Sequence, residues 1–315
     1  MRSGISSRPF STWQKKTTVV LLGTGMPRPS MTASGPATAV VVTREKENSR
    51  PAEQHVFLVD AGPGVERQLS GARLTISGPD AVFLTHLHSD HTIGYPDLIL
   101  TSWVMGRRKP LQVYGPPGLQ NMTDHLIAAY SEDIKVRTEG LEHQTMDGYK
   151  VDVHEIALAG REYGQGSREK AAGIVVYDSL GVRVTAIPVP HGNWEFAYAY
   201  RFDTPDRSVV ISGDTRYSEE LALAARGVDV LVHEVYPSKR LKPENRPGGE
   251  DWPKYMHEFH TSEIELGKLA SIAQPKLLIL SHVVSMGASD DELVRGVREG
   301  GFQGRVEVGK DLGKY

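Results

Sequence analysis

The sequence of 315 residues contains no cysteine. This absence excludes disulfide bonds, thiolate nucleophiles, iron–sulfur clusters and cysteine-ligated zinc, so any bound metal ion must be held by histidine, aspartate or glutamate. The sequence also lacks an apolar run of about 20 residues, which excludes a protein with transmembrane helices. The mean hydropathy of −0.33 and the 39% of hydrophobic residues are typical of a globular chain with a large core.

The chain also lacks an excess of basic residues, because 36 Lys and Arg stand against 39 Asp and Glu, a formal net charge of −3. Dedicated nucleic-acid-binding domains carry a basic excess, so this balance argues against that class, although a local basic patch remains compatible with it. The N-terminal region contains no acidic residue before Glu45. We interpret residues 1–16 as a basic tail, with a short organelle-targeting peptide as the alternative, and we expect a cytoplasmic protein.

Short apolar segments closed by Gly or Pro alternate with helical patterns from residue 17 to residue 315, without an interdomain linker, which predicts one α/β domain. Strands are predicted at 18–22, 38–42, 55–60, 81–85, 111–114, 182–189, 197–202, 209–212, 228–235, 276–281 and 304–308. Helices are predicted at 65–70, 95–105, 119–130, 218–225, 261–272 and 290–299. Residues 160–173 and the proline-rich residues 237–259 are predicted to be long surface loops, the second an ordered lid.

Three histidines and an aspartate are concentrated in the segment Thr85-His-Leu-His-Ser-Asp-His91, directly after a predicted buried strand. His86 and His88 lie two residues apart and can reach one metal ion, whereas Asp90 and His91 lie further round the loop and can reach a second. Ligands placed just past a strand end are held rigidly by the sheet. A solvated polar loop is the alternative interpretation, and the preceding strand argues against it.

Three further candidate ligands each follow an apolar strand. These are His191, Asp214 and His282, and we expect all three at the same edge of the fold as the histidine motif. Together the candidates are five histidines and two aspartates, which provide four nitrogen or oxygen ligands per ion if Asp214 bridges two ions. That donor set suits zinc with an open position for water.

A series of short motifs in a fixed order extends over residues 17–310. They are Leu21–Gly25, Leu58–Gly64, Thr85–Gly94, Val113–Gly118, Pro190-His191, Ser212–Thr215, Val232–Val235, His260–Ser262 and Leu280–His282. With these motifs the chain resembles the metallo-β-lactamase superfamily and, within it, the ribonuclease Z and arylsulfatase-like branch. The resemblance implies a single αββα sandwich, in which two mixed β-sheets lie face to face with helices outside, and two Zn2+ ions per chain at the sheet edge.

The resemblance also implies a role for each candidate. The first zinc ion would be held by His86, His88 and His191. The second would be held by Asp90, His91 and His282, and Asp214 would bridge the two ions.

Four further roles follow from the same resemblance. Asp60 would order the loop beneath the metal ions. Asp90, Glu234 and His260 would be the catalytic residues, and the last two would relay a proton to the leaving group. For Glu234 a surface carboxylate, and for His260 a polar residue beside a helix start, are the alternative interpretations.

The sequence departs from the ribonuclease Z pattern between His191 and Asp214. Ribonuclease Z enzymes carry a long Gly-rich, tRNA-gripping arm there, and residues 192–213 are too few for it beside a predicted hairpin. We therefore expect hydrolysis of a small phosphodiester or sulfate ester, in a protein without a membrane partner that forms a homodimer by family resemblance. The alternatives are β-lactam or lactone opening and RNA 3′-processing without the arm. A catalytically inactive scaffold is disfavoured because all seven candidate ligands are present.

Overall fold

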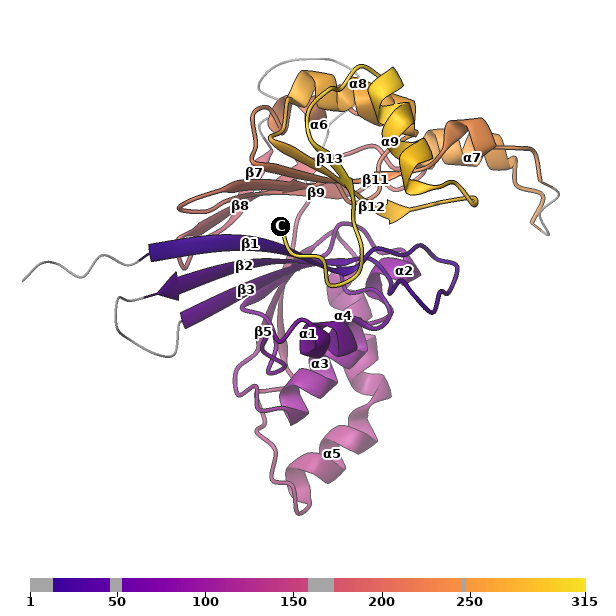
Figure 1. The fold of residues 1–315 in the computed structure, drawn as a ribbon. Coiled ribbons are helices and arrows are strands. Elements are labelled where there is room, and N and C mark those ends of the chain that lie inside the picture. Colours follow the sequence, from indigo (N-terminus) through magenta and orange to yellow (C-terminus); the bar gives the residue numbers. More distant parts are fainter. Residues whose placement is uncertain (1–13, 46–52, 158–172, 245–247) are drawn as a thin grey trace, which may run out of the picture.

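The computed structural model describes residues 14–45, 53–157, 173–244 and 248–315. Two mixed β-sheets lie face to face and helices cover their outer faces, so that the layers follow one another as helices, sheet, sheet and helices (Figure 1). This αββα sandwich confirms the predicted fold class. Among the described residues, no helix is both long and apolar enough to cross a membrane.

The first sheet contains six strands in sequence order. They are β1 (Gln14–Gly23), β2 (Ala37–Glu45), β3 (Glu53–Val59), β4 (Ala81–Phe83), β5 (Leu111–Gly115) and β6 (Val151–Glu155). The pairs from β1 to β3 are antiparallel and those from β3 to β6 are parallel. The outer face is covered by α1 (Val65–Gly71), α3 (Tyr95–Val104) and α4 (Leu119–Ala129).

The second sheet has the strand order β13-β12-β11-β10-β9-β8-β7. Its strands are β7 (Ile174–Ser179), β8 (Val182–Pro188), β9 (Tyr198–Asp203), β10 (Ser208–Ile211), β11 (Val230–Val235), β12 (Leu277–Val283) and β13 (Val306–Val308). The pairs from β7 to β10 are antiparallel and those from β10 to β13 are parallel. The outer face is covered by α6 (Glu219–Ala224), α8 (Glu263–Ala273) and α9 (Asp290–Glu299).

The central strands are apolar on both faces because each sheet is covered on both sides there. In β1, Val19 and Leu21 point into the core between the sheets, whereas Val20 and Leu22 point toward the outer helices. This division follows from the two-residue period of a strand. Each continuous apolar run therefore contributes side chains to two cores, one between the sheets and one beneath the outer helices.

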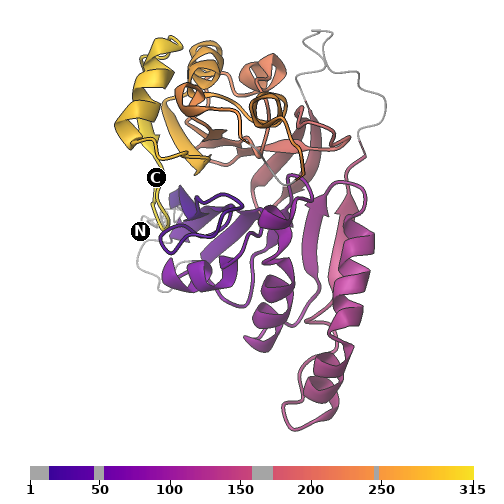
Figure 2. The same ribbon diagram turned by 90° about the vertical axis from the view of Figure 1, so that its right-hand side faces the viewer.

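The C-terminal residues connect the two sheets. After β13 the chain crosses to the first sheet and runs along β1, where Tyr315 and Val19 exchange both backbone hydrogen bonds at 3.0 and 2.9 Å. The helix α5 (Ser131–Glu139) extends away from both sheets (Figure 2). The C-terminal residues thus connect the two sheets beside β1, and α5 projects from the half of the fold that contains the first sheet.

Several sequence predictions need correction. β1 begins at Gln14, which pairs with Glu45, whereas the predicted strand begins at residue 18. The predicted lid at 237–259 contains a short 3₁₀ helix (Ser238–Arg240) and α7 (Trp252–Phe259). The prolines of this segment predict a loop, but Pro253 lies in the first turn of α7, where the helix needs no N–H donor. Residues 158–172 of the other predicted loop lie outside the described residues.

Candidate metal centre

The seven candidate ligands come together where strands of both sheets end. His86 follows β4, His191 follows β8 and Asp214 follows β10, whereas His282 lies within β12. Asp90 and His91 lie on the one-turn helix α2 (Ser89–Thr92) that follows the β4 loop. Because β10, β11 and β12 are parallel, their carboxyl ends meet at one edge, facing the loop after β4.

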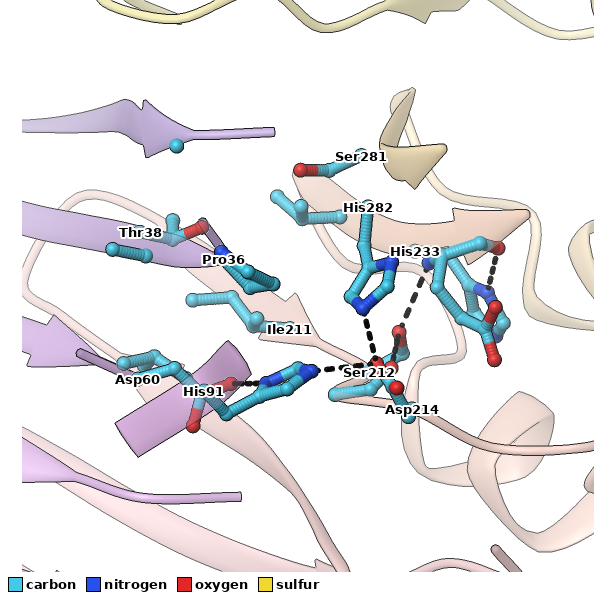
Figure 3. A pocket seen from close by; sticks show the side chains of 16 residues that line it. Pro36, Thr38, Asp60, His91, Ile211, Ser212, Asp214, His233, Ser281 and His282 are labelled. Carbon is cyan, nitrogen blue, oxygen red and sulfur yellow. Dashed lines mark hydrogen bonds and ion pairs between the residues drawn. The ribbon is translucent and has the colours of Figure 1, made fainter. Parts of the chain in front are cut away.

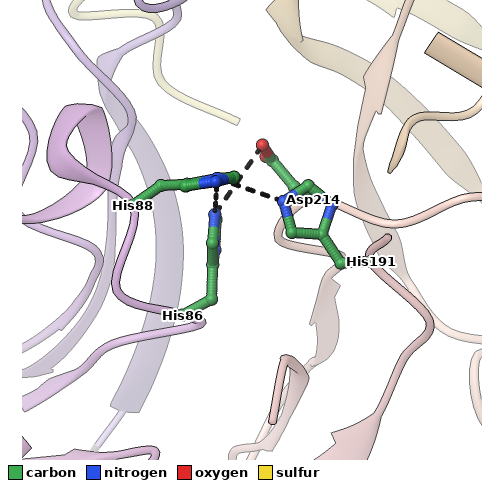
Figure 4. A group of neighbouring side chains, drawn as sticks. All are labelled: His86, His88, His191 and Asp214. Atoms are coloured by element: carbon green, nitrogen blue, oxygen red, sulfur yellow. Dashed lines mark hydrogen bonds and ion pairs between the residues drawn. The ribbon is translucent and has the colours of Figure 1, made fainter. Parts of the chain in front are cut away.

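The first cluster consists of His86, His88, His191 and Asp214, each with one ligand atom within 4.8 Å of the others (Figure 4). His88 Nδ1 lies 2.9 Å from His86 Nε2 and 3.2 Å from His191 Nε2. Asp214 Oδ2 lies 3.9 Å from His86 Nε2. Three imidazole nitrogens and one carboxylate oxygen therefore converge on one point.

The second cluster consists of Asp90, His91 and His282. His91 Nε2 and His282 Nε2 lie 3.3 and 3.4 Å from the other carboxylate oxygen of Asp214, Oδ1 (Figure 3). Asp90 Oδ2 lies 3.6 and 3.4 Å from the same two nitrogens. Asp214 thus directs one oxygen to each cluster, which is the arrangement that a bridging ligand requires.

The facing atoms of the second cluster are orphaned. Asp90 Oδ2, His91 Nε2, Asp214 Oδ1 and His282 Nε2 are buried and have no hydrogen-bond partner within the described part of the chain. Buried polar atoms are nearly always paired, so four that converge without partners indicate a site built to bind a cation. The nitrogen and oxygen donor set fits zinc, and the residues therefore fit the metal ions that the fold implies.

Asp60 supports the loop that carries His86, His88, Asp90 and His91. It follows β3 directly, and its carboxylate accepts hydrogen bonds from the backbone N–H of Thr85 at 2.8 Å and from the Thr85 hydroxyl. Asp60 Oδ2 also lies 2.8 Å from Nδ1 of His91. Because Nδ1 is engaged by the carboxylate, the opposite nitrogen of His91 is directed into the second cluster.

Two contacts to the ligands had not been predicted from the sequence. His191 Nδ1 donates to the backbone carbonyl of Phe259 at 2.7 Å, and Trp194 Nε1 lies 2.9 Å from His88 Nε2. The carbonyl could not have been found, because a backbone atom leaves no residue signature. For Trp194 the signal was its position three residues after His191.

Glu234 and His260 also lie beside the first cluster. Glu234 is in β11 and His260 follows α7, and the two carboxylate oxygens lie 3.2 and 3.1 Å from His260 Nδ1. The Glu234 carboxylate is held in place by the backbone N–H of Thr215 at 3.0 Å. Burial alone would lower the pKa of His260, but the charge and hydrogen bond of Glu234, with the charge of Asp214, raise this pKa to about 9. The arrangement can therefore hold a proton beside the two clusters of candidate ligands.

The segment between His191 and Asp214 is described in full and contains β9 and β10. These strands are paired as an antiparallel hairpin from Tyr200–Ile211 to Asp203–Ser208. The predicted absence of a long arm at this position is therefore confirmed.

The comparison with protein families agrees with this geometry. Residues 55–283 match the model of the beta-lactamase superfamily domain, which covers more than half of the chain. The protein belongs to the metallo-β-lactamase superfamily, and its fold and site are those of a metal-dependent hydrolase.

Among curated relatives, the chain is 32% identical over 301 residues to a protein of Mycobacterium sp. (strain KMS) described as ribonuclease Z, covering 93% of this chain and 94% of the relative. Two solved structures share the fold at lower identity. The metallo-beta-lactamase fold protein YhfI from Bacillus subtilis has a TM-score of 0.66 and 18% identity, covering 95% of this chain and 98% of that one. Human tRNase Z, short form, has a TM-score of 0.64 and 21% identity with the same coverage.

Proposed function

We propose that the protein is a dinuclear zinc-dependent phosphodiesterase. The proposal rests above all on Asp214, which directs Oδ2 to the first ligand cluster and Oδ1 to the second. Bound zinc ions would act as Lewis acids that polarise the phosphoryl group. His86, His88 and His191 would hold one ion, and Asp90, His91 and His282 the other.

The pair of Glu234 and His260 supports hydrolysis of an ester with a poor leaving group. An alkoxide is a poor leaving group that departs faster when it receives a proton. His260, whose Nδ1 lies 3.2 and 3.1 Å from the Glu234 carboxylate oxygens, would donate this proton.

The ribonuclease Z relatives favour a phosphodiester over a sulfate ester, because RNA is linked by phosphodiesters. They also remove one argument against an RNA substrate. The alignment with the mycobacterial relative covers nearly all of both chains, so neither has a long internal segment that the other lacks. A relative described as ribonuclease Z therefore also lacks a long arm that this chain does not have. For this reason RNA 3′-processing is the second candidate function.

Relative kcat/KM values on zinc-loaded protein test the proposal. The panel contains bis-p-nitrophenyl phosphate, p-nitrophenyl sulfate, nitrocefin and a precursor tRNA, and His86→Ala serves as the control for contaminating hydrolases. We expect the phosphodiesters to be preferred and the variant to be inactive. Faster turnover of the sulfate or of nitrocefin would overturn the proposal. Cleavage of the precursor tRNA just after the discriminator base would establish the second candidate.

The partners follow from the same reasoning. With a net charge of −3, we expect any tRNA binding to be weak and to fall steeply with salt concentration, because it would depend on counterion release at few cations. The family resemblance adds a homodimer to the proposal, which sedimentation equilibrium would test. Tight tRNA binding that persists at high salt would show that the chain has a docking surface for RNA.

A further inference from the structure

Trp194 contacts a candidate metal ligand through an atom that can only donate a hydrogen bond. Its Nε1 lies 2.9 Å from Nε2 of His88, and the two rings are nearly perpendicular, with centroids 4.9 Å apart. The indole nitrogen is a donor only, so Nε2 of His88 must be the acceptor. A neutral imidazole then carries its one proton on the other nitrogen. The contact therefore assigns the proton of His88 to Nδ1.

A backbone carbonyl fixes the proton of a second ligand candidate, His191. Nδ1 of His191 lies 2.7 Å from the carbonyl oxygen of Phe259, which can only accept. His191 therefore carries its proton on Nδ1, and its Nε2 has a free lone pair. That lone pair lies 3.2 Å from Nδ1 of His88, the atom to which the tryptophan contact assigns a proton. The two assignments, made from opposite ends, agree.

These four groups form a chain of hydrogen bonds with one direction. Trp194 donates to His88, which donates to His191, and His191 in turn donates to the carbonyl of Phe259. Nδ1 of His88 also lies 2.9 Å from Nε2 of His86 (Figure 4). Rotation of the His88 ring by half a turn would place carbon atoms at all of these contacts. The orientation of the ring is therefore fixed together with its proton.

A metal ion at the first cluster requires a different proton position in His88 but not in His191. The nitrogens that face each other in the cluster are Nδ1 of His88 and Nε2 of His191. A coordinating nitrogen must offer a lone pair to the ion. His191 already offers one, whereas the proton of His88 must move from Nδ1 to Nε2. Both forms of the ring are neutral, so the change concerns the position of one proton and not the charge.

A proton on Nε2 of His88 is incompatible with the contact to Trp194. Two N–H groups would then face each other at 2.9 Å, and neither could accept a hydrogen bond. A ligating histidine donates its other N–H to a carboxylate, a carbonyl or water, and an indole N–H cannot replace these acceptors. Trp194 is partly exposed and its neighbours Asn193 and Glu195 are exposed, so the ring has room to turn toward solvent.

We propose that Trp194 is a switch that responds to metal binding: it holds His88 in the form with the proton on Nδ1, and a zinc ion at the first cluster turns the indole away. Trp194 therefore opposes the ion and lowers the zinc affinity of the first cluster. A residue that merely supported His88 would raise this affinity instead. The inference rests on the metal centre of the proposed function and adds to it a side chain that is not a ligand.

Nuclear magnetic resonance of the indole N–H groups tests the switch directly. The chain has four tryptophans, so protein isotope-labelled at tryptophan nitrogen gives few signals, and Trp194→Phe identifies that of Trp194. Addition of zinc to chelator-treated protein should shift this signal upfield, because the hydrogen bond to His88 is lost. Trp103 is the internal control, since its Nε1 donates to the carbonyl of Thr145 at 2.9 Å, outside the clusters. Its signal should stay in place.

Zinc affinity provides a second, independent test. Trp194→Phe keeps an aromatic ring but removes the N–H donor, so we expect the first cluster to bind zinc about 2- to 10-fold more tightly, the usual range for one net hydrogen bond. Titration against a chelator in the Asp90→Ala background, in which the second cluster is weakened, would measure this affinity. Trp252→Phe, which removes an indole at the start of α7, is the matched control and should leave the affinity unchanged.

Failure of this inference differs from failure of the proposed function. If the Trp194 signal stays in place while elemental analysis shows that zinc is bound, the switch is overturned and the metal centre remains. Unchanged or lower zinc affinity in Trp194→Phe would also overturn the switch, and lower affinity would mean that Trp194 supports His88. Absence of bound zinc in the wild type would overturn the proposed function together with the switch.

Discussion

Nδ1 of His260 lies 3.1 Å from Oε2 of Glu234 and 3.9 Å from Oδ2 of Asp214. One imidazole ring therefore faces both its carboxylate partner and the carboxylate that joins the two ligand clusters. The side chains of Glu234 and Asp214 are both buried, so their charges act on the ring with little screening by solvent. These two carboxylates favour the protonated form of the ring beside the ligand clusters.

We expect His260→Ala to lower kcat by about 10²–10⁴-fold for an alkyl phosphodiester and only slightly for a p-nitrophenyl ester. The alkoxide needs a proton to depart, whereas p-nitrophenolate departs without one. Glu234→Gln should show the same pattern more mildly, because the ring loses its orienting charge. Steady-state kinetics on both substrates, with elemental analysis to show that the metal content is unchanged, would check this.

Equal losses on good and poor leaving groups would mean that His260 positions the substrate or supports the fold.

The pH profile offers a second check on the same residue. The pKa of His260 is raised to about 9 by Glu234 and Asp214 against the opposing effect of burial, so the proton is lost only in alkaline solution. Activity on the alkyl ester should therefore fall at alkaline pH, at or below pH 9 because bound cations repel the imidazolium. His260→Ala should lack this limb.

The two ligand clusters predict different effects of two substitutions on metal content. His86→Ala removes a ligand of the first cluster and should lose most of one ion, whereas Asp90→Ala should weaken the second. The wild type should hold close to two divalent ions per chain, and chelation should abolish activity reversibly. Inductively coupled plasma mass spectrometry would measure the ratios, with the exposed Asp124→Asn as control. Active wild-type protein without metal would contradict the whole mechanism.

Asp60→Asn tests the support beneath the loop. Asparagine has nearly the same shape and tolerates the positive φ of 61° at this position, so the backbone should be preserved. The amide cannot accept all the hydrogen bonds from Thr85 and His91, and we expect metal affinity to fall about 10–100-fold. Titration against a chelator of known affinity would measure the loss. Unchanged affinity would show that His91 is oriented without Asp60.

Glu66 predicts a dependence of stability on pH that is independent of catalysis. Both of its carboxylate oxygens are buried without a hydrogen-bond partner among the described residues. Burial, with a smaller effect of Asp97 and against the attraction of Arg107, raises the pKa of Glu66 to about 8. Between its usual pKa and this value the folded protein binds a proton that the unfolded chain does not. The free energy of unfolding therefore falls as pH rises through this range.

Glu66→Gln removes this titration. The variant should be more stable than the wild type at pH 9, by a few kcal/mol since one pKa unit corresponds to about 1.4 kcal/mol, and similar to it at pH 5. Urea unfolding of both proteins at both pH values would give the difference in the free energy of unfolding between them. Effects of metal binding cancel in this difference because both proteins have the same candidate metal ligands. Glu139→Gln, at an exposed position of α5, serves as the control. A constant difference between the proteins at both pH values would contradict the assignment.

The sequence revealed the central strands because they are buried on both faces and read as unbroken apolar runs. The edge strands β6 and β7 escaped prediction because they are partly exposed and lack such runs. The helices α5 and α7 were missed for a related reason, since neither buries a continuous apolar stripe. In α7 the prolines of the preceding segment suggested a loop, although Pro253 is compatible with the first helical turn.

By itself the sequence determined which residues are candidate ligands, from residue type and position near strand ends, and its composition excluded cysteine ligands. The tertiary structure alone decided which oxygen of Asp214 faces which cluster, and that a carbonyl from Phe259 orients His191 across 68 positions of the chain. It alone also decided that α7 lines a cavity at His260. The reason is physical: these contacts join segments far apart in the chain, and backbone atoms and cavity walls are defined by the packing of the two sheets rather than by any local pattern.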